Sequence, residues 1–505
     1  MRPRRSLIRT FLVAAVATGA SLALAGPATG QVDEGWGQYQ GNAARTGAAT
    51  AAPAPPYTMG WQAEAAIGTP QDLLGFPVPV VVGGLAVVVG RESVIAVAVA
   101  DGTVAWSIER APGPSTPAAT TEDGSLVLVT EGGGDDDTAT SEASTPSAAT
   151  PTVAVTPSPS APPDLAVVSA LVALDPETGE RVWEHALPDV SRTGPAILGD
   201  RAFVGTDGGD LIAVEAASGD ALWDASVGDE VVLPLAAADD LVLAAAASTE
   251  VGGSSVLVAV GAADGEEAWR HTPALAGSPV GAPSVGDGTA YVALGDRSLV
   301  ALELADGTER WSAPMNRAGG LPPTIQDDLV VAVDASGQIY GFDTEDGQER
   351  WDHALNLGFV GAPVAVPGAI VVPGDDRTVA SLDPENGELI DRLQVSGDVV
   401  VGIAATPDTL VASVSSDAPS LLGLVHDDDR PLVHVPSPTT PDLPSLLGAW
   451  LVAAVPLVAI LWVVGRRLWT ALPPIELPVE DAVSEASGGG DGGEDGDGEG
   501  DEVDR

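Results

Sequence analysis

Cysteine and histidine, which commonly bind metals or act in catalysis, are sparse or absent in this chain of 505 residues. The chain has no cysteine, and its five histidines do not stand at the spacing of a zinc site. Three of them, His185, His271 and His353, each follow a tryptophan by two residues, whereas His426 and His434 do not. This regularity indicates packing or exposure at equivalent positions of a repeated unit, and it disfavours a metal centre.

Carboxylates are the abundant reactive groups, and one acidic run resembles a calcium loop in composition. The run "DGDGEGDE", residues 495–502, lacks the glutamate at the position that completes such a loop. It belongs to a tail from Glu480 to Arg505 that holds 11 acidic residues among glycine and serine. We interpret the tail as a solvated acidic segment, and we predict no metal site.

An internal repeat defines the elements that must position the remaining residues. The phrase "LVALDPETGERVW", residues 171–183, recurs with variations along the chain. Its glycine returns at intervals of 77, 40, 46, 42, 40 and 40 residues, as Gly102, Gly179, Gly219, Gly265, Gly307, Gly347 and Gly387. Tryptophan follows four positions later as Trp106, Trp183, Trp223, Trp269, Trp311 and Trp351, whereas Asp391 follows Gly387. A fixed period of this length indicates stacked modules.

Each repeat unit has the composition of a small antiparallel sheet. Between Trp311 and Trp351, short runs rich in valine and isoleucine alternate with turns of glycine, proline, aspartate and serine. We interpret the unit as a meander of four strands, which cannot bury its apolar face alone. The period favours a β-propeller over a β-solenoid, because solenoid coils are usually shorter.

The glycine and the tryptophan of the repeat have separate physical reasons. In "DPETGE" the aspartate and Pro176 favour a turn, and Gly179 accepts the left-handed conformation that this turn requires. The tryptophan is expected to cover a small residue ten positions before it, namely Ala96, Ala173, Ala213, Ala259, Ala301 or Gly341. Because burial of one such ring contributes about 3 kcal/mol, the rings are predicted to hold neighbouring blades together.

One repeat carries the pattern Ala-x-Asp-x-x-Thr-Gly-x-x-x-Trp in full, as Ala173, Asp175, Thr178, Gly179 and Trp183. This pattern resembles the tryptophan-docking motif of PQQ-type propeller repeats. The segment "WGQYQGNAARTG", residues 36–47, resembles the stretch that commonly precedes their first blade, and the resemblance covers roughly residues 36–430. It implies an all-β propeller, as in the eight-bladed quinoprotein alcohol dehydrogenases and the non-catalytic assembly lipoproteins of the BamB type.

We predict eight blades of four antiparallel strands, with seven blades as the alternative. The glycine hairpins define seven units, and residues 398–425 have strand spacing without the Gly-Trp ending. The segment "YTMGWQAEAA" around Trp61 is predicted to supply the missing outer strand of the eighth blade. Strands from both ends of the propeller would then close the ring and remove exposed sheet edges.

A catalytic site is the most demanding hypothesis that the resemblance raises. A PQQ-dependent dehydrogenase needs oxygen ligands for Ca²⁺, an aspartate base and a basic residue at the quinone, and such enzymes often add a disulfide of adjacent cysteines. This chain has no cysteine, and its repeats after the second are short. Polar residues that can face one mouth of the ring are Arg192, Asp229, Glu230, Asn316, Arg317 and Asn356. We interpret them as solvated loop groups, and we predict neither catalytic residues nor a cofactor.

Segments outside the propeller predict export and a membrane anchor. Residues 1–25 have a basic start, an apolar core and a small-residue end, as in a signal peptide. "RRSLIR" approaches a twin-arginine pattern, so the Sec and twin-arginine routes both stay open. Residues 446–465 carry no charge over 20 positions and predict a transmembrane helix. Arg466 and Arg467 place its C-terminal side in the cytoplasm, and a lipoprotein anchor is excluded because cysteine is absent.

Three further segments have low complexity. Residues 131–164 lack a strand pattern and are predicted to be a disordered insert in the second blade, which explains the interval of 77 residues. Residues 431–445 form a Pro-rich stalk, and residues 466–505 form an acidic, disordered cytoplasmic tail.

The charge of the chain limits its partners. The formal net charge is −51, from 72 acidic residues and 21 arginines, with no lysine. Such a surface repels phosphate, so binding to nucleic acid is disfavoured. A salt-rich habitat and a GC-rich genome both account for this composition. Without disulfides, the stability of an exported chain must come from the packed ring.

Among function classes, we favour a membrane-anchored, extracytoplasmic propeller that binds envelope or extracellular proteins as a scaffold. A PQQ- and calcium-dependent quinoprotein dehydrogenase is the first alternative, and an extracellular sensor that signals through the cytoplasmic tail is the second. The resemblance to BamB suggests envelope assembly. A helix followed by arginines fits the cytoplasmic membrane better than the outer membrane.

Overall fold

The computed structural model describes the chain in ten ranges, namely residues 36–63, 78–133, 169–231, 233–248, 255–275, 280–355, 361–374, 377–395, 399–415 and 420–432. These ranges contain strands and turns and no α-helix. No helix that is long and apolar enough to cross a membrane occurs within them. The predicted signal peptide, transmembrane helix and cytoplasmic tail lie outside the ranges, as does the predicted stalk after residue 432.

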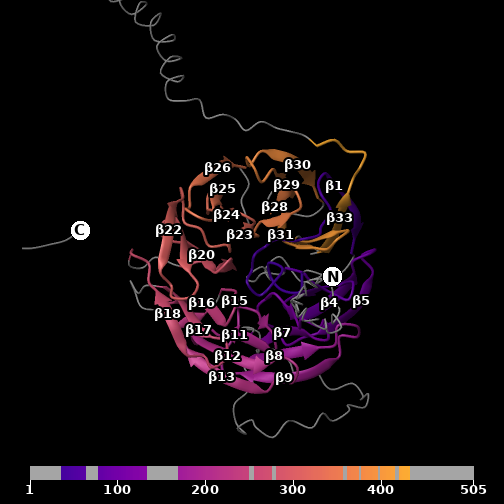
Figure 1. The fold of residues 1–505 in the computed structure, drawn as a ribbon. Helices are drawn as coiled ribbons and strands as arrows, with labels where there is room; N and C mark the ends of the chain where they lie inside the picture. The colour runs from indigo at the N-terminus through magenta and orange to yellow at the C-terminus, as the bar shows by residue number, and fades with distance from the viewer. Residues whose placement is uncertain are drawn as a thin grey trace, which may run out of the picture. The chain divides into compact units, whose positions relative to one another are not determined.

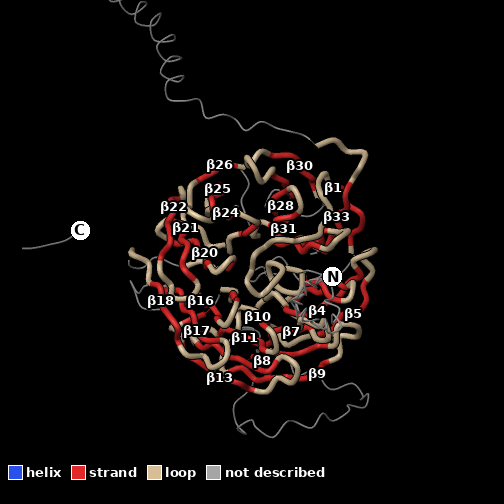
Figure 2. The backbone as a smooth tube through the Cα atoms, in the orientation of Figure 1, coloured by secondary structure: helices blue, strands red, loops and turns tan. Residues whose placement is uncertain are grey.

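The strands form eight antiparallel sheets, which are the blades of a β-propeller (Figure 1). Figure 2 shows the strands of each blade following one another outward from the centre of the ring. The prediction of eight blades is thereby confirmed. The apolar core lies in layers between blades, because valine, leucine and alanine side chains of each sheet pack against those of the next.

The first four blades are consecutive in the chain. Blade 1 comprises β2 (Val80–Val82), β3 (Leu85–Val89), β4 (Ser93–Ala98) and β5 (Val104–Glu109). Blade 2 comprises β6 (Ala119–Thr120), β7 (Val127–Gly132), β8 (Ser169–Leu174) and β9 (Arg181–Leu187). Blade 3 comprises β10 (Ala196–Leu198), β11 (Arg201–Gly205), β12 (Asp210–Glu215) and β13 (Ala221–Ser226). Blade 4 comprises β14 (Glu230–Val231), β15 (Ala236–Ala238), β16 (Leu241–Ala247), β17 (Val256–Gly261) and β18 (Glu267–His271).

The other four blades include the one that closes the ring. Blade 5 comprises β19 (Ser284–Gly286), β20 (Thr289–Leu294), β21 (Ser298–Glu303) and β22 (Glu309–Pro314). Blade 6 comprises β23 (Thr324–Gln326), β24 (Leu329–Val333), β25 (Gln338–Asp343) and β26 (Glu349–Ala354). Blade 7 comprises β27 (Val364–Val366), β28 (Ala369–Pro373), β29 (Thr378–Leu382) and β30 (Leu389–Gln394). Blade 8 comprises β31 (Val399–Ala405), β32 (Leu410–Ser415), β33 (Ser420–His426) and β1 (Tyr57–Gln62).

Blade 8 combines strands from both ends of the propeller, as predicted. Its sheet has the order β1-β33-β32-β31, so β1 takes the outer position that the last strand of every other blade occupies. Tyr57 pairs with His426 and Trp61 pairs with Gly423 in an antiparallel register. The predicted pairing of the strand around Trp61 with the 398–425 meander is therefore confirmed.

Two details differ from the sequence prediction. Blade 4 has five strands, because the short strands β14 and β15 both pair with β16. In blade 2, β7 continues through Gly132 and pairs with β8 there, so the insert begins after Gly132 instead of at residue 131. Glu131 tolerates burial in this strand because Arg181 forms an ion pair with it at 2.7 Å.

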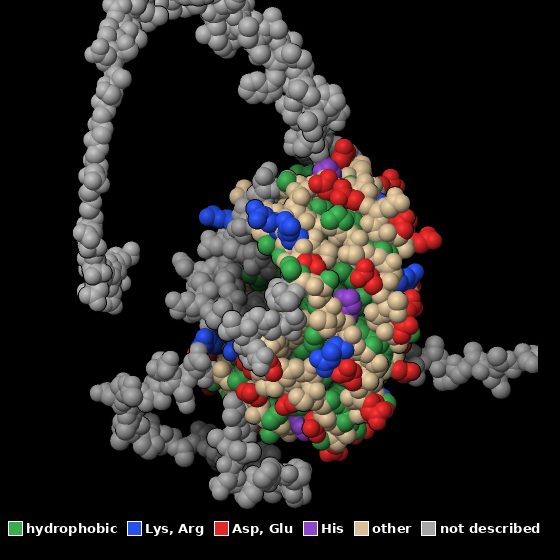
Figure 3. All heavy atoms as spheres, turned by 90° about the vertical axis from the view of Figure 1, so that its left-hand side faces the viewer, with side chains coloured by type: hydrophobic (Ala, Val, Ile, Leu, Met, Phe, Trp, Pro, Cys, Tyr) green, Lys and Arg blue, Asp and Glu red, His purple; other side chains and the backbone are tan. Residues whose placement is uncertain are grey.

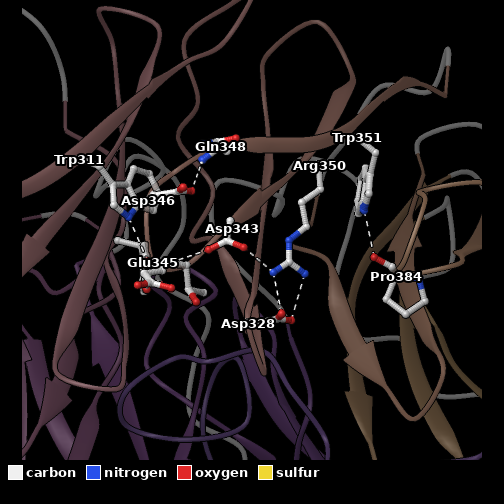
Figure 4. Close-up of polar contacts among 11 residues, drawn as sticks. Trp311, Asp328, Asp343, Glu345, Asp346, Gln348, Arg350, Trp351 and Pro384 are labelled. Carbon is white, nitrogen blue, oxygen red and sulfur yellow. Dashed lines mark hydrogen bonds and ion pairs between the residues drawn. The ribbon is translucent and has the colours of Figure 1, made fainter.

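A tryptophan on the outer strand joins each of seven blades to the next. Each indole Nε1 donates a hydrogen bond to a carbonyl in the following glycine hairpin. The pairs are Trp61–Val99 (2.7 Å), Trp106–Pro176 (2.8 Å), Trp183–Ala216 (3.2 Å), Trp223–Ala262 (3.1 Å), Trp269–Leu304 (2.7 Å), Trp311–Thr344 (3.0 Å) and Trp351–Pro384 (3.0 Å). Figure 4 shows two of these steps, with Arg350 between them.

The repeated glycine is required by both its backbone angle and its neighbour. Gly347 has φ +71°, a conformation that residues with a Cβ rarely adopt. A Cβ on Gly347 would also lie 2.5 Å from Cε3 of Trp311, well inside van der Waals contact. In their own blades, six of the seven rings lie opposite the small residue ten positions before them, as in the pair Ala301–Trp311, and Trp61 lies opposite Gly423. The indole is therefore held between two positions that lack bulky side chains.

Polar groups replace the tryptophan contact between blades 7 and 8, beside the apolar core that these blades share. Asp391 takes the place of the tryptophan and is buried, and its Oδ2 accepts a hydrogen bond from Tyr57 N at 3.0 Å. Arg430 Nη2 lies 2.8 Å from Asp391 Oδ1, an ion-pair contact whose angle falls outside hydrogen-bond geometry. Arg430 also donates to the carbonyls of Tyr57 and Arg392. Charged groups thus link the outer strand of blade 7 to β1, the strand that closes blade 8.

An ion-pair network lies beside the tryptophan contacts of blade 6. Arg350 Nη2 lies 2.7 Å from Asp328 Oδ2 and 2.6 Å from Asp343 Oδ2 (Figure 4). Hydrogen bonds from Arg350 hold the pKa of both carboxyls below the ordinary value. The turn between β23 and β24, which carries Asp328, is thereby linked to the outer strand of the same blade.

Candidate functional site at the propeller axis

Residues 36–49, which we call the axial segment, lie at the centre of the ring and join its inner strands (Figure 1, indigo). Six inner-strand N–H groups donate to carbonyls of this axial segment. The bonds are Val81–Trp36 (2.8 Å), Thr120–Gly37 (2.7 Å), Ala237–Ala43 (2.7 Å), Val285–Ala44 (2.7 Å), Ile325–Thr46 (2.7 Å) and Ala365–Gly47 (2.7 Å). They reach blades 1, 2, 4, 5, 6 and 7, so the segment follows the blades in their order around the ring.

Gln38 makes the contact to blade 3 with its side chain. Its Nε2 donates to the carbonyl of Ile197 at 2.8 Å, and its Oε1 accepts from the N–H of Ile197 at 2.8 Å. The amide therefore replaces a peptide group as the partner of β10. With this contact, seven of the eight blades are hydrogen-bonded to the axial segment within the described residues.

Arg45 is the buried cation of the axial segment. Its side chain has no exposed surface, its Nε donates to the carbonyl of Leu235, and its Nη1 donates to the carbonyl of Tyr39 at 3.0 Å. The guanidinium lies 5.0 Å from the centre of the Tyr39 ring. Burial lowers the pKa of Arg45 to about 10 and raises the pKa of Tyr39. At neutral pH the guanidinium is charged and the phenol is neutral.

The backbone of the axial segment is strained at two positions. Gln40 and Arg45 both have φ +59°, which is uncommon for residues with a Cβ. Both side chains are buried, and the surrounding inner strands hold them in place. Such conformations cost of order 1–3 kcal/mol each and persist only where the surrounding structure determines them strongly.

The residues at the axis do not fit a PQQ and calcium site. In the ten described ranges, no group of three or more histidine, aspartate and glutamate side chains is placed to hold a metal ion. The inner strands bind the chain's own residues 36–49, with Trp36, Tyr39 and Arg45 buried there, so protein atoms fill the centre of the ring.

The loop residues singled out in the sequence do not assemble into one site. Arg192 Nε forms an ion pair with Asp207 at 2.8 Å in blade 3, and Asp229 Oδ2 accepts from Ser248 Oγ at 3.2 Å in blade 4. Glu230 begins the short strand β14. Asn356 lies outside the described residues. These positions are distributed over several blades, and their contacts are local.

Asn316 and Arg317 belong to a turn that is organised by Asp334. The Oδ2 of Asp334 accepts from Arg317 N at 3.0 Å and from Tyr340 Oη at 2.8 Å, and Tyr340 Oη accepts from Asn316 N. Burial raises the pKa of Asp334, but hydrogen bonds from Ser336 and Tyr340 outweigh it and lower the pKa overall. A carboxylate that accepts this many hydrogen bonds stabilises a turn and is a poor general base.

The histidines that follow the tryptophans cap the next hairpin. His185 Nδ1 lies 2.9 Å from the carbonyl of Gly219, and His353 Nε2 lies 2.9 Å from the carbonyl of Asn386. Burial lowers the pKa of His271. The prediction of repeated packing is confirmed for His185 and His353.

A small cavity lies between blades 5 and 6. It has a volume of about 190 Å³ and is lined by Asp287, Thr289, Tyr291, Arg310, Asp327 and Glu345 among others. Sites for drug-sized ligands usually measure 300–1,000 Å³. Arg310 is already bonded to Thr289, so the cavity offers room for water or a few ligand atoms.

The sequence of this chain is similar to those of known proteins. The family model "Outer membrane protein assembly factor BamB" matches residues 168–318 and 252–407. A curated protein of that name from Nitrosomonas eutropha is 26% identical over 206 residues, which is 38% of this chain and 49% of the relative. The chain thus matches about half the length of that relative.

Solved structures show the same fold. The crystal structure of BamB from Moraxella catarrhalis has a TM-score of 0.52 at 17% identity, with 73% of this chain and 98% of that chain covered. A quinohemoprotein alcohol dehydrogenase from Pseudomonas putida has a TM-score of 0.55 at 13% identity, with 81% and 83% covered. At these identities the likeness is one of fold, which enzymes and non-enzymes share.

Proposed function

Because the chain belongs to the PQQ-type β-propeller repeat family, we propose that it is an extracytoplasmic scaffold that binds other envelope proteins through its propeller. The matched relatives are assembly factors by name, which supports a role in the envelope. Attachment to the cytoplasmic membrane is part of the proposal. It rests on the apolar residues 446–465 and the two arginines after them.

The occupied axis is the observation that carries the proposal. The centre of a propeller is where a small ligand can contact several blades at once, and here residues 36–49 make those contacts. The surfaces that the fold offers to other molecules are therefore the two faces and the rim. Such surfaces suit proteins better than small substrates.

Of the two faces, we propose that partners bind the one formed by the blade-to-blade connections, which we call the loop face. The opposite face carries the glycine hairpins, which receive the tryptophans of the preceding blades. Longer connections lie on the loop face, such as residues 315–323 between β22 and β23. Arg297 and Arg317 are exposed there, in a chain with an excess of carboxylates (Figure 3), and arginine is frequent at protein interfaces.

Cross-linking in intact cells tests this proposal. A photo-reactive amino acid replaces Arg317 on the loop face in the full chain, and in a matched control it replaces the exposed Asp306 on the hairpin face. We expect specific envelope proteins to be captured from the Arg317 position and identified by mass spectrometry, with little capture from the Asp306 position. Capture of no envelope protein from either position, or equal capture from both, contradicts the proposal.

Titration of the purified full chain with PQQ and Ca²⁺ tests the alternative of a quinoprotein. We expect neither a saturable absorbance change nor a shift in melting temperature, because the axis is filled by residues 36–49. A saturable shift together with dye-linked alcohol oxidation would support the dehydrogenase.

A further inference from the structure

Arg45 carries a charge that the described residues do not balance. It forms two hydrogen bonds, both to backbone carbonyls, and its Nη2 has no hydrogen-bond partner within the described residues. The same residues provide no carboxylate within ion-pair distance of it, whereas Arg181, Arg192, Arg350 and Arg430 each face an aspartate or glutamate. Arg45 therefore differs from these arginines in having a fully buried charge with no carboxylate partner among the described residues.

Burial of an unpaired charge in the protein interior is energetically unfavourable. Transfer of an isolated ion from water into an apolar environment is so costly that buried charges in proteins are normally paired or neutralised. Arginine cannot avoid this cost by losing its proton at neutral pH. The nearest ionisable group, the Tyr39 phenol, cannot supply a negative charge, because burial keeps it protonated. Carbonyl oxygens satisfy hydrogen bonds but leave the net charge in place.

We infer that Arg45 binds a small inorganic anion of the halide class at the propeller axis. The free Nη2 group supplies the charge-assisted hydrogen bond, and the complete burial of the side chain restricts the ligand to a small ion. The buried side-chain amide of Gln40, on the same segment, also has no partner among the described residues at either Nε2 or Oε1. A water molecule can satisfy such a neutral amide group, but only an anion also balances the guanidinium.

The inferred anion lies where the axial segment meets blade 4, because Arg45 donates to the carbonyl of Leu235 just before β15. An anion that binds the folded ring and not the unfolded chain stabilises the ring by mass action. The stability of the propeller is therefore expected to depend on the identity of the anion, apart from its dependence on ionic strength.

Diffraction from crystals of the full chain grown in bromide tests the site directly. Bromide has the chemistry of chloride and is located by its anomalous signal. We expect an anomalous peak in contact with Nη2 of Arg45. A water molecule without anomalous signal at that position, or a carboxylate of the chain itself against Nη2, overturns the inference.

Thermal unfolding of the full chain provides an independent test. Chloride replaces a bulky organic sulfonate at constant ionic strength, and Arg45→Met is compared with Arg317→Met, which removes an exposed arginine. We expect the melting temperature of the wild type and of Arg317→Met to rise saturably with chloride, and that of Arg45→Met to stay constant. An equal rise in Arg45→Met overturns the inference. If Arg45→Met does not fold, the bromide experiment on the wild type decides.

Discussion

Replacement of Gly347 by alanine tests whether the tryptophans hold the blades together. The position has φ +71°, and alanine in this left-handed conformation costs about 1–2 kcal/mol. The new Cβ would lie 2.5 Å from Cε3 of Trp311, whereas carbon atoms pack at about 3.5–4.0 Å. The indole must therefore move by about 1 Å, and such overpacking costs about 1–3 kcal/mol. We expect Gly347→Ala to lower the free energy of unfolding by about 2–5 kcal/mol in total.

Gly368→Ala is the matched control for this experiment. Gly368 has φ +78°, and no atom lies within 4 Å of the position that its Cβ would take. Its substitution carries only the backbone cost of about 1–2 kcal/mol. The difference between the two variants, about 1–3 kcal/mol, isolates the contact with the ring.

Urea denaturation of the full chain, followed by tryptophan fluorescence, measures both variants. A third comparison uses the Trp311→Ala background, in which Gly347→Ala should cost no more than Gly368→Ala because the ring is gone. Equal destabilisation by Gly347→Ala and Gly368→Ala in the wild-type background would refute the idea that the indole contact contributes to stability.

Three further predictions concern polar contacts. Arg430→Met leaves the buried Asp391 unpaired, so we expect a loss of about 3 kcal/mol in urea denaturation, and an unchanged midpoint contradicts this. Arg350 lowers the pKa of Asp328 and Asp343 in the folded chain, so on acidification the unfolded chain binds protons first. The stabilisation by these ion pairs is therefore lost as pH falls through and below 3.8. Arg350→Gln should make the melting temperature depend less on pH in this acidic range. Gln38→Leu removes both partners of the Ile197 peptide, at a cost of about 2–4 kcal/mol, and hydrogen exchange at the Ile197 amide should accelerate.

The sequence favoured eight blades over seven and predicted how the ring closes, and the structure agrees with both. Both rest on local chemistry that repeats, because a turn glycine and a bulky indole leave a recognisable pattern at each occurrence. Trp61 could be recognised as a displaced outer strand because it had the same pattern without a preceding hairpin. The observed pairing of Trp61 with Gly423 agrees with this prediction.

The inner strands and the path of the axial segment were not predictable in the same way. An inner strand such as Thr324–Gln326 is only three residues long, too short to show an alternating pattern. The contacts of residues 36–49 join positions that are up to 318 residues apart, as in Gly47 and Ala365, and a single sequence has no signal for such pairings. The only hint at Arg45 was an arginine among small residues.

The repeated glycine also makes room for the tryptophan of the preceding blade, and the sequence did not predict this second role. Its turn conformation is a property of its own hairpin, so the sequence alone reveals it. Its closeness to an indole depends on the preceding blade, as for Gly179 and Trp106, and appears only when the blades are assembled.

The axial segment has a consequence for the order of folding. Residues 36–49 precede every blade in the chain, yet their partners extend to Ala365 in blade 7. Their hydrogen bonds to blades 4 to 7 therefore join positions that are distant in the sequence, and such contacts are slow to form. Whether the blades assemble around this peptide or enclose it when the ring closes, residues 36–49 complete their set of partners only once blade 7 has formed.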